Sequence, residues 1–422
     1  MINMWEQIRM NRRRSVVLVV LMALLLTALG YVIAEGAQPG AGPFGVLIAM
    51  GVWLVMMLVA YFQGDNILLA VSGAREIEKK DHPRLFNVIE EMQIASGLPK
   101  MPRVFIIDDM ALNAFAAGRK PDKAVVAVTA GLLGKLNRDQ LQGVVAHEMS
   151  HIVNRDVLLM TIVGVTIGSI VLISELFLRG FRLGGRGAHS RRYGSSRGGD
   201  GAGGIMIVIA IVLAILAPIV AQFVYLAISR RREYLADASA AVLTRYPEGL
   251  AGALQLIGGD PTPMARATKA TAPMFISNPF EKPGAMALNL TSTHPPIQER
   301  IKILRGMSGA ASFHAYDDAL KTVRGRKSGV VPRSALAADQ ALPVRPPHAE
   351  DEAPDPRMRM REAGDLVRQM NQFAIIACPC GIKIKIPPDY ARPVAICPRC
   401  QRKHPIPTAT PIRTAKPKVK AE

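Results

Sequence analysis

The chain has 422 residues, enough for two or three domains, and half of them are hydrophobic. With 52 Lys and Arg against 33 Asp and Glu, its formal net charge is +19. In a soluble chain this charge would suggest nucleic-acid binding, but basic residues that flank apolar spans at an anionic membrane surface explain it better. Only four cysteines occur, all between residues 378 and 400, which excludes a disulfide scaffold spread over a secreted fold.

Two apolar runs near the N-terminus predict a transmembrane helical hairpin over residues 1–64, with spans at 16–34 and 44–62. A cleaved signal peptide is the alternative for the first run. That run is longer than a usual signal core and a second run follows it, so we favour a retained hairpin. The turn at 35–43 contains no Lys or Arg, whereas both outer flanks do. The positive-inside rule therefore places the N-terminus and the chain after residue 64 in the cytoplasm.

The next segment is typical of a soluble α/β unit. We expect a helix over residues 84–96, then strands over 102–109 and 124–129, the second rich in Val. The stretch Asn113–Gly118 lies between the two strands, and by itself it would be read as an ordinary turn.

A helix with the motif His147-Glu148-Met149-Ser150-His151 follows. Histidines four residues apart project from one helix face, so both rings can reach one Zn²⁺ ion. Glu148 lies beside them, where it could take a proton from a water. Asn137 and Gln140 suit an N-cap and its capping-box partner. The same pattern also arises by chance on amphipathic helices, where the histidines are only solvated or packed in the core.

Two more apolar runs, at residues 157–178 and 205–228, are each long enough to span a bilayer. The loop between them, 179–203, holds six arginines and one acidic residue. Two crossings would place that loop outside, against the usual charge bias. Either the segments cross despite this charge, or they form a hairpin that does not fully traverse; we expect a full crossing.

The sequence Ser229–Asp237 follows the fourth apolar run directly. A zinc peptidase needs a third protein ligand, and the fourth coordination position of the metal stays open for water. The third ligand is often a carboxylate on a second helix. Glu233 fits this role, and Asp237, one turn later, could orient a ligand histidine through its other ring nitrogen. The alternative is that Arg230–Arg232 and Glu233 only form the basic collar of a membrane helix.

Together these segments resemble the HtpX-like membrane zinc endopeptidases, relatives of the type 1 CAAX prenyl proteases. That family combines an N-terminal hairpin, an H-E-x-x-H helix, a second hairpin and an E-x-x-x-D helix. Here the H-E-x-x-H motif is His147–His151, and the E-x-x-x-D motif is Glu233–Asp237. Two further stretches match, Asn113–Ala116 and Ser292–Pro296 with the downstream Arg300. The resemblance covers roughly the first three quarters of the chain.

The resemblance implies a mainly α-helical membrane protein with transmembrane hairpins and an α+β zincin-like (gluzincin) peptidase domain. We expect this domain over residues 65–325, interrupted by the second hairpin. The implied catalytic zinc is held by His147, His151 and Glu233, with Glu148 as the general base.

The resemblance also implies roles for residues outside the two metal-binding motifs. Asn113 and Ala114 would hold the substrate backbone at an edge strand. His294 would polarise the scissile carbonyl oxygen, with Arg300 as a supporting charge. The alternative for this last stretch is a helix start, in which Glu299 and Arg300 lie on the surface.

The C-terminal part lies outside the resemblance. Residues 326–371, rich in Pro, Ala and charge, predict a linker that includes a short helix at 356–370, and residues 409–422 form a basic tail. Between them, residues 372–408 resemble a zinc ribbon, with a structural Zn²⁺ ion on four thiolates: Cys378, Cys380, Cys397 and Cys400. The first pair is C-x-C where most ribbons have C-x-x-C, and a disulfide pair is the alternative, although a cytoplasmic location disfavours it.

We therefore predict a multi-pass enzyme of the plasma (inner) membrane, with its active site and C-terminus in the cytoplasm. It would cleave protein or peptide substrates, chiefly damaged or misfolded membrane proteins. A dedicated processing peptidase of the CAAX-protease type, or a membrane-anchored scaffold that uses the ribbon, is the alternative. We expect the ribbon to recruit a protein partner. Because its flanks are basic, anionic lipid is an alternative binding partner, and nucleic acid is a less expected one.

Overall fold

The computed structural model describes residues 5–118, 120–155, 170–171, 173–179, 201–267, 271–280, 294–307, 309–325, 327–349 and 355–406. Four predicted features lie wholly or partly outside these residues: most of the run 157–178, most of the loop 179–203, Ser292 with Thr293, and the tail 409–422.

Two long N-terminal helices, α1 (Trp5–Ala37) and α2 (Gly42–Val71), contain the first two apolar runs. Within them Val19–Ala37 and Gly42–Val71 are long and apolar enough to cross a membrane. They approach each other closely at Gly30 and Gly45, where a Cβ atom on either residue would overlap the opposite helix. Small residues at this crossing therefore hold the predicted hairpin together.

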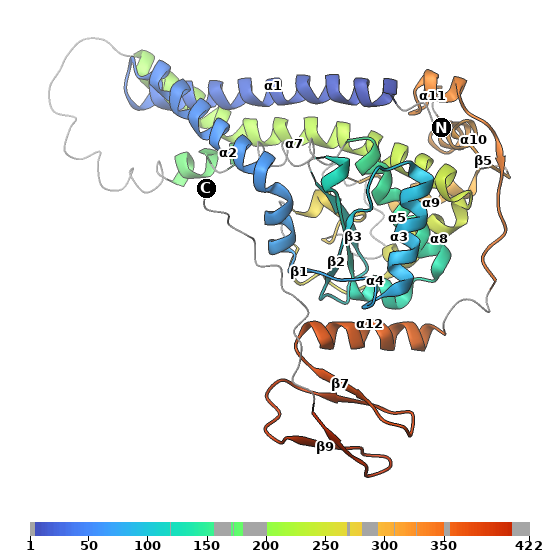
Figure 1. Ribbon diagram of the computed structural model, residues 1–422. Coiled ribbons are helices and arrows are strands. Elements are labelled where there is room, and N and C mark those ends of the chain that lie inside the picture. The colour runs from blue at the N-terminus through green and yellow to red at the C-terminus, as the bar shows by residue number, and fades with distance from the viewer. Residues whose placement is uncertain are drawn as a thin grey trace.

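A third helix, α7 (Gly201–Thr244), lies beside α1 (Figure 1). Its apolar half shares a buried cluster with the N-terminal hairpin, whose members are Met22, Leu26, Leu29, Ala49, Ile170, Ala214 and Ala217. The outward faces of these helices carry exposed large apolar side chains such as Val208, Leu24 and Phe44. Apolar side chains both between the helices and on their outward faces are typical of helices surrounded by lipid.

The peptidase part is built on a four-stranded sheet in the order β1-β2-β4-β3. Its strands are β1 (Ala74–Glu76), β2 (Arg103–Ile107), β3 (Ala114–Ala117) and β4 (Val125–Thr129). Strands β2 and β4 are parallel, and β3 pairs antiparallel with β4. The stretch that by itself reads as a turn is therefore the edge strand β3.

Helices pack around this sheet. They are α3 (Pro83–Ser96), α4 (Ala130–Lys135), α5 (Arg138–Val153), α8 (Pro247–Gly259), α9 (Ile297–Arg305) and α10 (Phe313–Arg324). The short α4, which the sequence analysis does not anticipate, separates β4 from α5. The main core combines the inner faces of sheet and helices, including Val126, Val145 and Leu254.

The C-terminal extension is ordered against the peptidase part. After α11 (Arg333–Ala337) and β6 (Leu342–Pro343), helix α12 (Pro356–Met370) lies below α4 (Figure 1), with the Met360 side chain close to Gly134. Residues 327–349, predicted as linker, contain the buried Val330 and Val331, whose N–H groups both donate to the Asp317 carboxylate. These hydrogen bonds, together with the burial of Val330, Val331 and Ala335 in the main core, hold this segment in place although it has no apolar repeat.

Two small hairpins end the described chain: β7 (Ala374–Ala377) with β8 (Lys383–Ile386), and β9 (Val394–Ile396) with β10 (Lys403–Pro405). The predicted β-ribbon architecture is therefore present, although it is made of two hairpins rather than one.

Helix α5 packs closely against α8 at Gly143, because a Cβ atom there would lie 2.6 Å from the Leu250 amide nitrogen. Replacing Gly143 by Ala should force these two helices apart and lower the free energy of unfolding by about 1–3 kcal/mol. The matched control is Gly259→Ala at the end of α8, where an added Cβ atom meets nothing within 4 Å. We expect a lower midpoint of thermal unfolding for Gly143→Ala alone; equal midpoints would contradict the packing described.

Candidate metal centre and active site

The start of α5 is fixed by the predicted capping box. The Asn137 side-chain oxygen Oδ1 accepts a hydrogen bond from the Gln140 N–H at 2.9 Å, and the Gln140 side chain accepts one from the Asn137 N–H at 3.0 Å. Because this cap sets where the helix begins, it also sets which face His147 and His151 share.

Three side chains from two helices converge on one point. The Nε2 atoms of His147 and His151 lie 3.3 Å apart on α5. Glu233, from α7, places one carboxylate oxygen 3.6 Å from the first of these nitrogens and the other 3.4 Å from the second. The three ligand atoms lie within 4.8 Å of one another, so the predicted ligand set is brought together.

These separations fit a zinc ion. Zn–N and Zn–O bonds of about 2.0–2.2 Å in a tetrahedron place neighbouring ligand atoms about 3.3–3.6 Å apart. The observed distances are 3.3 Å between the two histidine nitrogens, and 3.4 and 3.6 Å from them to different oxygens of Glu233; all three lie in that range. Three protein ligands leave one tetrahedral position for water or substrate, as in catalytic rather than structural zinc sites.

Asp237 lies behind the ligands, next to the ring of His147. Its Oδ1 atom is 2.9 Å from Nδ1 of His147, which leaves Nε2 of that ring to face the metal position. Arg300 donates two hydrogen bonds to the same carboxylate, from Nε at 2.8 Å and from Nη2 at 2.7 Å. Burial would raise the pKa of Asp237, but the Arg300 charge outweighs it and lowers the pKa.

Arg300 is itself fully buried, so the alternative that placed it on the surface is wrong. Besides binding Asp237, its Nη1 atom donates to the Ile276 carbonyl oxygen at 3.0 Å and lies 3.6 Å from Glu233. Arg300 therefore contacts both carboxylates behind the metal position. An arginine so deeply buried is stable only because it is paired in this way.

His294 is also buried, with its Nδ1 atom 3.0 Å from a carboxylate oxygen of Glu233. Burial would raise the pKa of Glu233, but His294, His147 and His151 together hold it well below its usual value. Glu233 is thus kept ionised, the form in which a carboxylate binds a metal.

Glu148 is 2% exposed and accepts a hydrogen bond from the backbone of Ala116 on the edge strand β3. Burial, the largest effect, raises the pKa of this carboxyl group above its usual value. A carboxylate with a raised pKa is a better general base near neutral pH. Glu148 therefore lies where β3 meets the metal position.

Asn113 and Ala114 lie at the start of β3, but the chain's own residues occupy their polar groups. The Asn113 side chain donates to the Ser277 carbonyl oxygen at 3.0 Å, and the Ile276 N–H donates to the Ala114 carbonyl oxygen at 2.9 Å. The Ala114 N–H donates to the Asn113 side chain at 3.1 Å. The sequence gives no sign of this contact with residues 276–277, because no motif marks them.

The four cysteines form a second cluster, on the two hairpins. Their Sγ atoms are separated by 3.4 Å between Cys378 and Cys400, 3.4 Å between Cys380 and Cys378, and 3.5 Å between Cys380 and Cys397, and all four are free thiols. Four converging thiols could hold one metal ion. His404, which the sequence analysis does not consider, has its Nε2 atom 3.3 Å from Cys378 Sγ.

Comparison with known proteins agrees with this site. The model of peptidase family M48 matches residues 79–308. A Protease HtpX homolog from Dictyoglomus thermophilum is 43% identical over 303 residues, which is 72% of this chain and 94% of that protein. A Protease HtpX homolog from Caldanaerobacter subterraneus subsp. tengcongensis is 43% identical over 299 residues, which is 71% of this chain and 96% of that protein.

A weaker likeness is to the crystal structure of S. mikatae Ste24p, at a TM-score of 0.37 and 19% identity, over 70% of this chain and 65% of that one. That match is too weak to add to the assignment, which rests on the sequence relatives and the metal ligands. With His147, His151 and Glu233 assembled as a zinc site, and more than half of its length matched by the family model, the chain belongs to the M48 metallopeptidases.

Proposed function

We propose that this membrane metallopeptidase hydrolyses peptide bonds of damaged or misfolded membrane proteins at the cytoplasmic membrane surface. The observation that carries the proposal is the joint position of the metal ligands and Glu148. The buried base contacts the edge strand beside which a peptide would lie, and it adjoins three ligands that leave one position open.

A bound zinc ion would polarise the peptide carbonyl and make a water acidic enough to deprotonate near neutral pH. The other roles fall to residues of this chain. Glu148 accepts the proton of the attacking water and then passes it to the leaving amine. His294, next to Glu233, hydrogen-bonds the carbonyl oxygen, and Arg300 with Asp237 fixes the ring of His147.

The position of Glu233 supports an active site near the membrane. One continuous helix, α7, carries both the apolar stretch Val208–Val220 and Glu233. At 1.5 Å per residue, Glu233 lies only about 20 Å along the axis beyond that stretch. Basic residues flank the first hairpin on its outer ends, so the positive-inside rule favours the cytoplasmic face. We keep the full crossing of 157–178 and 205–228 as part of this proposal.

Burial of the site favours an unfolded substrate. His147, Glu148, Glu233 and His294 are each at most 5% exposed. A compact protein surface does not reach groups this deep, whereas an extended segment can pair along a strand edge. This favours quality control. A dedicated processing peptidase of the CAAX-protease type is the second candidate, and an inert scaffold is disfavoured because the base and all three ligands are intact.

At the C-terminus we propose that Cys378, Cys380, Cys397 and Cys400 hold a second, structural zinc ion. So small a β module has little apolar core, and a metal would supply the missing stability. The ribbon then offers a basic surface for recruiting a protein partner or substrate.

Glu148→Gln should retain zinc and lose at least about 100-fold in peptide hydrolysis, because the amide keeps the shape of the side chain but takes up no proton. The measurements are zinc content and the rate of cleavage of an unfolded protein by the full-length chain in lipid. Cleavage at the wild-type rate would remove Glu148 from its assigned role.

The same Glu148→Gln variant tests the substrate class in cells. Quality control predicts that many membrane proteins accumulate relative to cells that carry the active enzyme. Accumulation of a single uncleaved precursor would instead favour the dedicated processing peptidase.

Zinc content should separate the two metal sites. We expect two zinc ions per chain in the wild type and one in both His147→Ala and Cys378→Ser, because the ligand sets share no residue. Elemental analysis of the purified full-length variants gives the count. One zinc ion in the wild type, lost only in His147→Ala, would refute a metal at the cysteines.

Asp237→Asn should weaken zinc binding at the peptidase site by about 10–100-fold, as is typical for groups that orient a ligand histidine. The substitution removes the charge that faces both His147 and Arg300. Asp318→Asn, at a side chain 73% exposed on α10, is the matched control. Competition with a chromogenic chelator measures the affinity; equal affinities of the two variants would contradict the orienting role.

A further inference from the structure

Arg345 lies in a segment that the family model does not reach, residues 342–348, which we call the C-terminal strap. The strap crosses the far ends of the two helices that carry the metal ligands. The Arg345 N–H donates to the Arg245 carbonyl oxygen at 2.9 Å, and the Arg245 side chain donates to the Pro343 carbonyl oxygen at 3.1 Å. The strap is therefore bonded to the end of α7 in both directions.

The side chain of Arg345 joins the two helices. Its Nη2 atom donates to the carboxylate of Asp139 at 2.5 Å and to the side-chain oxygen of Gln142 at 2.7 Å, both on α5. Its Nε atom donates to the Thr244 carbonyl oxygen at 3.1 Å, at the last residue of α7. The guanidinium carbon also lies 4.8 Å from the ring centre of Tyr246.

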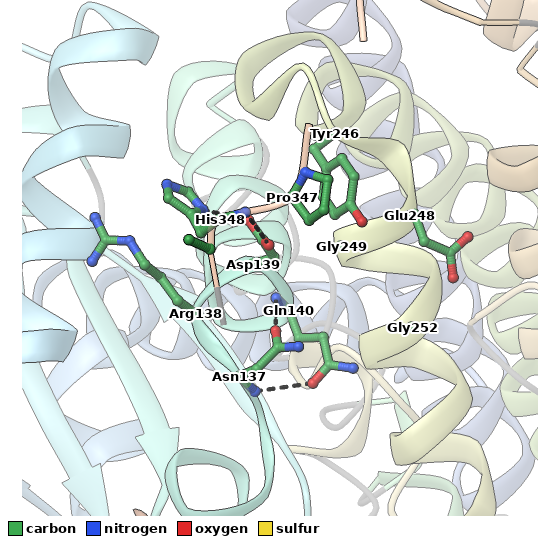
Figure 2. Close-up of a pocket in the computed structure, with 11 residues that line it drawn as sticks. Asn137, Arg138, Asp139, Gln140, Tyr246, Glu248, Gly249, Gly252, Pro347 and His348 are labelled. Carbon is green, nitrogen blue, oxygen red and sulfur yellow. Dashed lines mark hydrogen bonds and ion pairs between the residues drawn. The ribbon is translucent and has the colours of Figure 1, made fainter. Parts of the chain in front are cut away.

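Asp139 receives a second contact from the strap. His348 approaches the carboxylate with its backbone N–H at 3.0 Å and its Nδ1 atom at 2.6 Å (Figure 2). In the same view Pro347 and His348 form one wall of a pocket whose other walls are the starts of α5 and α8. Both oxygens of the Asp139 carboxylate are thus bonded to the strap.

These contacts imply that α5 and α7 run antiparallel, fastened at two places. At one end the start of α5 meets the end of α7 through Arg345. At the other end the metal ligands meet, His147 and His151 from α5 and Glu233 from α7. The polar fastening by the strap and the convergence of the metal ligands are separate contacts between the same two helices.

The geometry makes the metal site sensitive to this far contact. His147 is about 12 Å along α5 from Asp139, at 1.5 Å per residue. A tilt of roughly one degree about the clamped end would move a ligand at that distance by about 0.2 Å, which is the tolerance of a metal–ligand bond. Holding the helix angle is therefore a requirement for holding zinc.

We infer that Arg345 is a positioning residue, and that the C-terminal strap clamps α5 to α7 at the angle that His147, His151 and Glu233 need to bind zinc. The inference rests on zinc at the peptidase site. It gives part of the C-terminal extension a role in the active site, separate from any recruitment by the ribbon.

The test measures how tightly the full-length chain in lipid holds zinc against a competing chelator. The binding phase that disappears in His147→Ala is that of the peptidase site. In Arg345→Ala this phase should weaken about 10–100-fold. The phase that Cys378→Ser abolishes should not change. Absence of any phase lost in His147→Ala would overturn the metal site itself, so the two failures are distinguishable.

Two further variants complete the design. Arg361→Ala, an exposed arginine on α12, removes the same charge and should leave zinc affinity unchanged. Arg345→Lys keeps the charge, but one ammonium group cannot bridge Asp139 and the Thr244 carbonyl as the planar guanidinium does. Arg345→Lys should fold as the wild type does but bind zinc more weakly. It replaces Arg345→Ala in the test if that variant does not fold.

A lower thermal midpoint with unchanged zinc affinity, in either Arg345 variant, would show that the strap only adds stability and would overturn the inference. Peptide cleavage gives a second readout. At zinc concentrations that do not saturate the Arg345 variants, their kcat should fall in proportion to the fraction of enzyme without zinc. Their KM for an unfolded substrate should stay at the wild-type value. A rise in KM alone would place Arg345 in substrate binding and would also overturn it.

Discussion

The structure depends on a fully buried group of charges between α5 and α9. Asp237 is held between the ring of His147 and the guanidinium group of Arg300, and all three are inaccessible to solvent. Neither Asp237 nor Arg300 could be buried alone, since an uncompensated buried charge destabilises a fold by several kcal/mol. Metal binding and folding are therefore coupled, because the pairing that stabilises the core also sets the ligand ring.

The same pairing helps to connect five segments of the peptidase core that come from different parts of the sequence. Arg300 on α9 reaches Asp237 on α7, and also the Ile276 carbonyl oxygen, whose residue is bonded to the edge strand at Ala114. The edge strand in turn contacts Glu148 on α5. A single hydrogen-bonded path thus links the metal ligands, the edge strand and Glu148.

Much of this site could be predicted from sequence, because its residues sit at helical spacings. The cap at Asn137, the pair His147 and His151, and the one-turn step from Glu233 to Asp237 are local patterns with a direct physical meaning. Helix α12 matched its expected limits for the same reason.

Contacts between distant segments could not be predicted in this way. Nothing local shows that Arg300 is buried, that residues 276–277 bond to Asn113 and Ala114, or that Arg345 reaches Asp139. Residues 327–349 have no apolar repeat, and their sequence predicts a linker. They are held by a few buried apolar side chains and by arginine, aspartate and backbone hydrogen bonds, whose partners lie far away in sequence.

The separation of the ligands along the chain has a consequence for biosynthesis. His147 and His151 leave the ribosome long before Glu233, and the strap that holds the helices leaves it later still. Until translation reaches α7, the nascent chain has two of the three metal ligands and no Asp237 to orient His147. The zinc site can therefore be completed only after α7 has been synthesised.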